Sequence, residues 1–172
     1  MIEEIYIRDL GVIQEARLAF GPGLTVITGE TGAGKTMVLS ALGLLLGERS
    51  DTSSIRRGQV QAFVEGRLFL KENTDIAAQI TERLAEAGAE ISGGELIMNR
   101  SVSGEGRGRA SVSGKAAPIN LLSELGEKLV VVHGQSDQIR LKSAAAQREA
   151  LDQFAGVAAE LSEYQNHFQA WK

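Results

Sequence analysis

The stretch LTVITGETGAGKT, residues 24–36, decides how the rest of this sequence is read. Its first five residues are apolar or β-branched, which is typical of a strand that is buried on both faces of a sheet. The strand runs directly into the pattern G-x-x-x-x-G-K-[ST] at residues 29–36. Residues 37–46 are apolar on nearly every side and predict a helix in the core. The order of strand, glycine-rich loop and helix predicts a phosphate-binding loop.

Each residue type in this loop has a reason in the chemistry of a triphosphate. Glycines let the backbone turn its N–H groups inward around the phosphate oxygens. The helix that follows adds the positive end of its dipole, the Lys35 ammonium reaches the β- and γ-phosphates, and the Thr36 hydroxyl is a ligand for Mg²⁺. The residues predicted to bind the nucleotide are Gly29, Glu30, Thr31, Gly32, Ala33, Gly34, Lys35 and Thr36.

The acidic half of such a site is not visible in the sequence. In this class of proteins an Asp at the end of a buried strand also holds the Mg²⁺. The second buried strand predicted here is KLVVVHG, residues 128–134, and it runs into Gln135 instead of an Asp. A phosphate-binding loop alone does not define the reaction, because kinases, GTPases and mechanical ATPases all use one.

Composition limits the class of protein. The chain has 172 residues, 43% of them apolar, which is enough for one domain with a core. Its 22 acidic and 18 basic residues give a net charge of -4, so any contact with nucleic acid has to be local. It contains no cysteine, and its apolar runs are short and interrupted by charge. We expect a soluble, intracellular protein without membrane contact.

The remaining pattern predicts an α/β domain with antiparallel hairpins. Residues 2–7 and 16–20 alternate as the two strands of a first hairpin, and residues 95–103 and 108–114 as those of a second. Further strand-like pieces lie at residues 54–55 and 62–70. Helical spacing covers residues 74–88, and residues 118–126 predict a short helix that begins at a proline.

The peptide ISGGEL, residues 91–96, has the appearance of the signature with which ABC-type ATPases clamp a nucleotide on a partner subunit. In those ATPases the signature comes after a loop that carries a glutamine, here Gln135, and it opens a helix. Here Gly93 and Gly94 precede Gln135 by some forty residues and lead into an alternating strand. Because both glycines tolerate positive φ, we interpret the peptide as a turn.

The last thirty residues differ from the rest. Leu151, Phe154, Ala158, Leu161 and Phe168 fall at a and d positions of a heptad, which is the pattern of a coiled coil. Fewer than three heptads are visible, so an amphipathic helix that packs on the domain is an equal alternative.

With these motifs in view, the sequence resembles the N-terminal half of the head of the RecN family, bacterial DNA-repair ATPases related to the SMC (structural maintenance of chromosomes) proteins. The matching stretches cover most of residues 1–142 in the expected order. They are IRDLGVI, LTVITGETGAGKT, LGLLLGERSD, IRRG, GRASVSGK and VVVHGQSDQ.

The resemblance implies roles for residues outside the loop. Gln135 resembles the glutamine that reaches Mg²⁺ and the attacking water, which makes it a catalytic candidate together with Lys35. The alternative is a glutamine that caps the next helix. Arg56 resembles the arginine that contacts nucleotide phosphates, although the adjacent Arg57 could take that place. His133 either orients Gln135 or caps its strand.

The resemblance also implies an architecture and partners. Residues 1–142 are expected to form the N-terminal lobe of a P-loop ATPase head of the ABC and SMC type, and residues 143–172 the root of an antiparallel coiled-coil arm. The implied cofactors are ATP and Mg²⁺. The implied partners are the chain's own C-terminal head half, a second head in a homodimer, and DNA held for double-strand break repair. The implied location is the bacterial cytoplasm, at the nucleoid.

Other functions stay open at this point. A kinase that passes phosphate to a small acceptor would use the same loop, but it should be complete in one chain and should carry an acid near the acceptor. A transporter ATPase would need the signature peptide, and a coiled-coil adaptor would leave the loop without a purpose. DNA contact is suggested by a basic group that we expect near the second hairpin, which consists of Arg100, Arg107, Arg109 and Lys115.

Overall fold

The computed structural model describes residues 1–30, 34–132 and 144–171. The chain divides into two units, Met1–Val130 and Val131–Lys172. The predicted boundary between residues 142 and 143 falls outside the described residues and stays a prediction.

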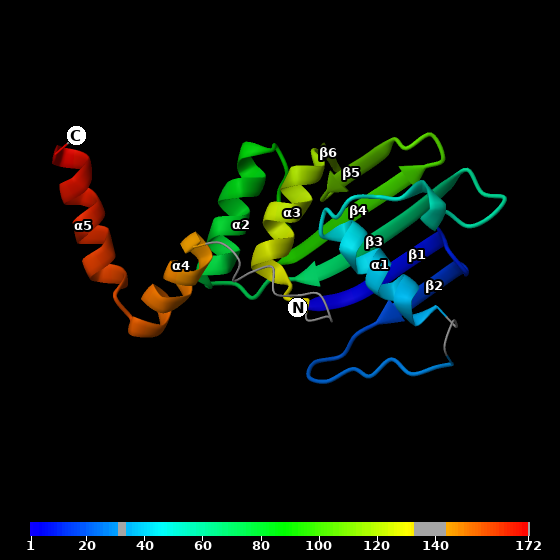
Figure 1. Ribbon diagram of the computed structural model, residues 1–172, viewed down its shortest axis with the longest axis horizontal. Coiled ribbons are helices and arrows are strands. Elements are labelled where there is room, and N and C mark those ends of the chain that lie inside the picture. Colours follow the sequence, from blue (N-terminus) through cyan, green and yellow to red (C-terminus); the bar gives the residue numbers. More distant parts are fainter. Residues whose placement is uncertain (31–33, 133–143, 172) are drawn as a thin grey trace. The chain divides into compact units, whose positions relative to one another are not determined.

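The first unit is built on a six-stranded antiparallel sheet with the order β2-β1-β3-β4-β5-β6 (Figure 1). Both predicted hairpins are confirmed, with Ile5 opposite Leu18 in the first and Arg100 opposite Ala110 in the second. The strands are β1 (Ile2–Leu10), β2 (Ile13–Ala19), β3 (Gln61–Phe69), β4 (Glu95–Ser103), β5 (Gly108–Val112) and β6 (Lys115–Ala117).

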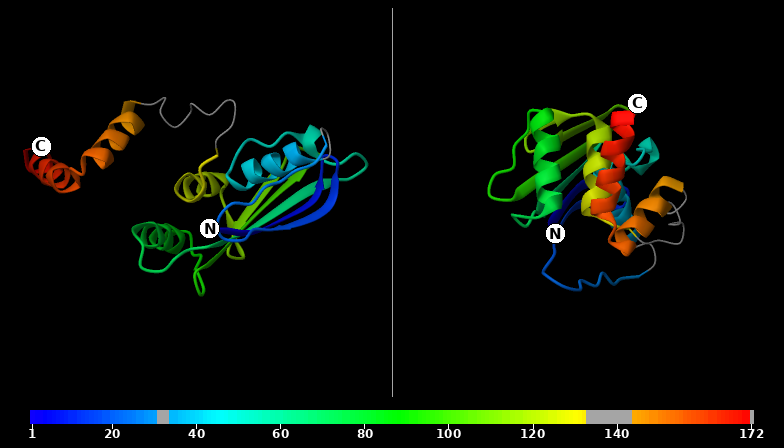
Figure 2. Two further views of the ribbon diagram at one scale, coloured as in Figure 1. Left: turned by 90° about the horizontal axis from the view of Figure 1, so that it is seen from below. Right: turned by 90° about the vertical axis from the view of Figure 1, so that its left-hand side faces the viewer.

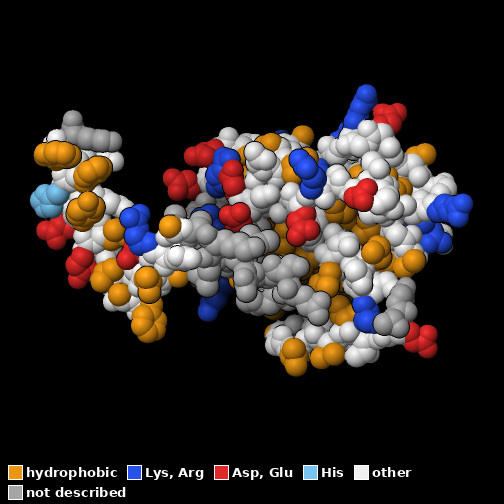
Figure 3. Space-filling model, in the orientation of Figure 1, with side chains coloured by type: hydrophobic (Ala, Val, Ile, Leu, Met, Phe, Trp, Pro, Cys, Tyr) orange, Lys and Arg blue, Asp and Glu red, His pale blue; other side chains and the backbone are white. Residues whose placement is uncertain are grey.

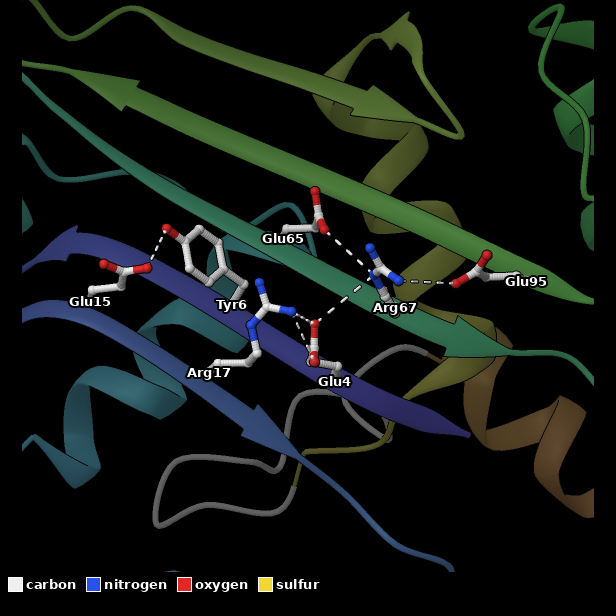
Figure 4. A network of polar contacts seen from close by, with 7 residues as sticks. All are labelled: Glu4, Tyr6, Glu15, Arg17, Glu65, Arg67 and Glu95. Carbon is white, nitrogen blue, oxygen red and sulfur yellow. Dashed lines mark hydrogen bonds and ion pairs between the residues drawn. The ribbon is translucent and has the colours of Figure 1, made fainter.

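Alternation along the strands gives the sheet two different faces. On the core face Ile7, Val64 and Met98 are at most 1% exposed. The other face, which we call the open face, carries polar and aromatic side chains. Figure 4 shows a network across it, in which Arg17 pairs with Glu4 and Arg67 lies between acidic side chains.

Three helices belong to this unit: α1 (Lys35–Leu45), α2 (Asp75–Glu86) and α3 (Ile119–Leu129). Helix α1 contacts β1, β3 and β4, while α3 contacts β5 and both other helices (Figure 2). The Thr74 hydroxyl caps α2 by accepting from the Ala77 N–H at 3.2 Å. An ion pair of 2.6 Å joins Arg83 of α2 to Glu124 of α3. The three predicted helices are therefore confirmed.

Three predicted strands are not present as strands. Residues 24–28 form no strand, and their apolar side chains are exposed, by 90% at Leu24 and 68% at Val26. Figure 3 shows hydrophobic side chains on the surface along this segment. Residues 128 and 129 belong to α3, and Val131 and Val132 are exposed without strand structure. The strand-like piece at residues 54–55 is the end of a short 3-10 helix, η1 (Thr52–Ser54), followed by one bridge from Ile55 to Leu10.

These differences have a common physical reason. A strand needs neighbours that satisfy its backbone groups, and a strand buried on both faces needs covering layers as well. Strands β1 to β6 pair with one another, and within the described residues none pairs with residues 24–28. Apolar composition alone therefore does not make this segment a strand.

The second unit contains α4 (Ala144–Ala155) and α5 (Ala158–Trp171). Instead of the single helix predicted for residues 143–172, residues 144–171 form two helices interrupted at Gly156 and Val157; the role of this segment as the root of a coiled coil stays a prediction. On α5 the rings of Tyr164 and Phe168 stack with their centroids 6.2 Å apart. No helix in the described part of the chain is long and apolar enough to cross a membrane.

Candidate nucleotide-binding site

The start of α1 is the centre of the candidate site. Gly34 caps the helix with φ of 97°, a conformation that a glycine adopts without strain. The first helical hydrogen bond runs from the Val38 N–H to the Gly34 carbonyl, at 3.2 Å. The preceding N–H groups therefore point out of the helix end, where they and the helix dipole favour an anion. No acidic residue lies in the first turn to compete with that anion.

The Lys35 side chain turns back over the loop. Its ammonium donates to the carbonyl oxygen of Gly29 and, at 2.6 Å, to that of Glu30. The loop end at Gly29 and Glu30 is thus held by the same cation that begins the helix. A triphosphate in the loop would offer this ammonium stronger, charged acceptors than two carbonyl groups.

Arg56 lies at the turn between β1 and β2. Its Nη1 donates to the Val12 carbonyl at 2.8 Å, and its backbone N–H donates to the Asp9 carbonyl at 2.9 Å. The same turn contacts the start of α1, because a Cβ built on Gly34 would lie 3.6 Å from the Val12 side chain. The structure therefore brings Arg56 and the phosphate-binding loop to one turn. Because hydrogen bonds hold Arg56 at this turn, Arg56 is the better candidate of the two.

Several predicted residues cannot be placed. Thr31, Gly32, Ala33, His133 and Gln135 lie outside the described residues, and their roles stay predictions. Thr36 is described and exposed on the first turn of α1, so its hydroxyl is accessible to a metal that bridges to phosphate. Among the described residues no cluster of three or more His, Asp or Glu side chains could hold a metal on its own.

The prediction of a basic group near the second hairpin is wrong for Arg100. Arg100 alternates with Met98 and Val102 onto the core face and is 2% exposed, so it lies on the opposite side of the sheet from Arg109. Its Nε and Nη1 have no hydrogen-bond partner in the described part of the chain. Burial lowers the pKa of this guanidinium. Arg107 and Arg109, by contrast, are on or near the surface of the hairpin turn, with Arg107 3.6 Å from Glu105.

The ISGGEL peptide is a turn, as predicted. Gly93 and Gly94 have φ of 60° and 78°, and a bridge pairs Ser92 with Glu95 at the start of β4. It opens a strand and no helix, so its geometry is not that of a signature peptide.

The family model for the AAA domain matches residues 4–169, which include nearly all of the first unit and most of the second. The chain belongs to the AAA domain family. This membership places it among the ATPase families and agrees with the phosphate-binding loop at the start of α1.

Relatives of this AAA domain are DNA repair proteins. The chain is 49% identical over 160 residues to DNA repair protein RecN of Streptomyces coelicolor, covering 92% of this chain and 27% of that protein. It is 36% identical over 173 residues to RecN of Bacillus subtilis, covering 99% of this chain and 29% of that protein. The chain thus spans less than a third of the length of these relatives.

Solved structures show the fold of this AAA domain. The Smc head domain with an extended coiled coil from Pyrococcus furiosus matches with a TM-score of 0.70 and 18% identity, over 98% of this chain and 45% of that one. The recombination mediator protein RecF with ATP matches with a TM-score of 0.58 and 18% identity, over 88% and 36% of the two chains. The predicted fold class, a P-loop ATPase head of the SMC type, is confirmed.

Sequence reasoning missed the turn that supports Arg56. Asp9 has φ of 55° and its carbonyl accepts from Arg56, while the side chain of Met37 in α1 lies against Gly11. A polar residue and a glycine close together between two alternating segments could have indicated a specialised turn. Its contact with residues more than forty positions away has no signal in the sequence.

Proposed function

We propose that this chain is the ATP-binding half of an SMC-like head that dimerises around ATP and Mg²⁺ and hydrolyses the nucleotide in DNA double-strand break repair. The observation that carries the proposal is the start of α1, where Gly34, the Lys35 ammonium and the free N–H groups of the first turn form an anion site. The RecN relatives, which are DNA repair proteins by name, support the biological setting.

In this site we assign each residue the task that its chemistry allows. The loop residues 29–34 hold phosphate through backbone N–H groups, and Lys35 compensates the charge of the β- and γ-phosphates. Thr36 supplies a hydroxyl ligand for Mg²⁺, which neutralises charge on the phosphates when bound. Arg56, which is hydrogen-bonded to the β1–β2 turn, adds a second cation, and Gln135 positions the attacking water.

The head also needs residues that the described chain does not offer. We propose that the C-terminal half of the head supplies an acid for Mg²⁺, a signature peptide for the partner's nucleotide, and strands that pair with the exposed apolar residues 24–28 and 130–132. The exposure of Val26 and Val131, by 68% and 52%, supports this completion. Closure of two such heads follows from a higher affinity of the closed state for ATP.

The proposal is tested by supplying that C-terminal half and measuring ATP turnover with and without DNA. Lys35→Ala should lower turnover by about 100-fold or more, because one preorganised cation at the transferring phosphate is lost. Lys71→Ala is a matched control, since Lys71 is an exposed lysine that follows β3, outside the loop. Equal turnover of wild type and Lys35→Ala would contradict the proposal.

The same assay also tests the role of Gln135 and the alternative that the protein is a kinase. Gln135→Ala should keep ATP binding and slow hydrolysis; loss of binding would remove the assigned role. Turnover by residues 1–172 alone, with phosphate delivered to a small acceptor, would favour the kinase.

A further inference from the structure

A shallow hollow of about 670 Å³ lies at one side of the sheet, and part of its lining belongs to the open face. That part consists of Phe63 on β3, Asn99 and Ser101 on β4, and Arg109 and Ser111 on β5. Its rim includes the small residues Gly114 and Ala116 at the hairpin between β5 and β6. Its volume is in the range of sites for small organic ligands. The nucleotide site at α1 is different, because α1 packs on the core face.

The strand register places three side chains of this hollow in one row with Arg8, which lies outside the hollow. Arg8 stands opposite Phe63, Phe63 opposite Ser101, and Ser101 opposite Arg109. With strands about 4.8 Å apart, the row from Arg8 to Arg109 spans about 14 Å. Two cations therefore flank an aromatic ring and a hydroxyl at a spacing that fits a short stretch of a nucleic acid strand.

The central ring has one aromatic and one cationic neighbour on the open face. The Arg8 guanidinium lies 5.6 Å from the centroid of the Phe63 ring, and the Tyr6 ring lies 6.2 Å from it at an angle of 59°. Aromatic rings and arginine planes on a sheet are the surfaces on which unpaired bases stack. Because every base has a π-face, such a surface accepts a strand of any sequence.

Hydrogen-bonding groups converge beside the ring. The Asn99 Nδ2 donates to the Ser111 hydroxyl at 3.1 Å, whereas the Asn99 Oδ1 is buried and has no partner in the described part of the chain. A buried amide oxygen without a donor is costly, so a ligand with an N–H group would be favoured here. The exocyclic and ring N–H groups on the edge of an unpaired base are such donors.

The charge on the open face is unevenly distributed. In the network of Figure 4, Arg17 forms an ion pair with Glu4, and Arg67 forms ion pairs with Glu4 and Glu95. Arg8 and Arg109 are exposed, and neither forms an ion pair with another described residue. The positive charges that are available to bind phosphate are therefore those of Arg8 and Arg109, at the two ends of the row.

We propose that this hollow and the row from Arg8 to Arg109 bind single-stranded DNA, with an unpaired base stacked at Phe63, its edge at Asn99, and the backbone phosphates at Arg8 and Arg109. The inference rests on the proposed role in DNA repair, which makes DNA the nucleic acid concerned. Unpaired strand is favoured over duplex because paired bases do not offer their faces to a ring.

The test uses this chain completed by its C-terminal half and measures the fluorescence anisotropy of a labelled oligothymidylate. A hairpin duplex of equal charge is the second probe, and binding of fluorescent ATP is measured in parallel. Phe63→Leu should weaken oligothymidylate binding about tenfold and leave duplex binding unchanged, since a base stack is worth that much. Arg109→Gln should lower the slope of log affinity against log salt by about one.

Arg67→Gln is the matched control, because it removes the same charge from the same face outside the hollow. It should change oligothymidylate binding less than twofold. If Phe63→Leu unfolds the head, Arg109→Gln and Arg67→Gln still test the inference. Equal effects of Arg109→Gln and Arg67→Gln, or equal losses with duplex and single strand, would overturn it. Retained ATP binding without any DNA binding would also overturn it while leaving the nucleotide site intact; loss of ATP binding in wild type would instead refute the proposed function.

Discussion

Two regions of this chain have similar compositions but different surroundings. Strands β1, β3 and β4 bury the apolar side chains of their core face almost completely, as Ile7, Val64 and Leu96 show at 0% exposure. Residues 24–28 contain the same residue types, yet Leu24 and Val26 are 90% and 68% exposed. The difference teaches that apolar, β-branched sequence becomes a strand only where partners are within reach.

Connectivity explains which region finds its partners. The strands of the sheet pair antiparallel, and hairpins such as β1–β2 and β4–β5 close with a few residues. A parallel strand needs a crossover connection and cover on both faces. Residues 24–28 are followed by α1, and in the described part of the chain no neighbouring strand pairs with them.

The largest expected effect tests this contrast directly. Leu122→Ala should lower the free energy of unfolding by about 2–5 kcal/mol, because Leu122 of α3 is 0% exposed. Val26→Ala should change it by less than about 0.5 kcal/mol in this chain, since little apolar area is lost from the core. Urea denaturation of both variants is the measurement. Comparable losses would show that residues 24–28 are packed in solution.

Arg100 is a polar exception within the buried region. Arg100→Met should raise the free energy of unfolding by about 1–4 kcal/mol, because an apolar side chain replaces a buried charge without hydrogen-bond partners for Nε and Nη1. Arg109→Met is the control on the neighbouring strand and, being exposed, should stay within about 0.5 kcal/mol of wild type. Destabilisation by Arg100→Met would indicate that the guanidinium has an anionic partner.

A substitution in the turn before β4 should have an intermediate effect on the free energy of unfolding. A Cβ on Gly94 would lie 2.8 Å from the Leu70 carbonyl oxygen, and φ is 78°. Gly94→Ala should therefore cost about 2 kcal/mol in thermal or urea unfolding, from strain and crowding together. Gly93→Asn should be nearly neutral, because Asn tolerates the left-handed region and the position opens to space. The reverse order of the two variants would contradict the turn.

The smallest effect concerns the ion pair between α2 and α3. The hydrogen bond from Arg83 lowers the pKa of the Glu124 carboxyl below its ordinary 4.5. The ion pair therefore stabilises the folded state above pH 4.5, and this stabilisation is lost as the pH falls through the lower pKa that Glu124 has in the folded state. Glu124→Gln should melt slightly below wild type at pH 7, and the difference should shrink as the pH falls below 4.5. A difference that is constant with pH would mean that charge is not involved.

Part of the fold could be predicted because its signals are local. Alternation at residues 2–7 and 95–103, helical spacing at residues 74–88 and the paired glycines at residues 93 and 94 depend on neighbours along the chain, and the structure agrees with each. The phosphate-binding loop was found in the same way, since residues 29–36 carry the pattern themselves. The strands expected at residues 24–28 and 128–134 failed because their environment depends on partners elsewhere.

The sequence by itself therefore determined the loop, the helix that follows it, the hairpins and the family resemblance, because each is written in consecutive residues. Only the tertiary structure decided that Arg56 and the start of α1 contact the same β1–β2 turn, that Arg100 is buried while Arg109 is exposed, and that Arg8, Phe63, Ser101 and Arg109 form one row. The physical reason is that strand register and packing join residues far apart in the chain, and no local pattern encodes those distances.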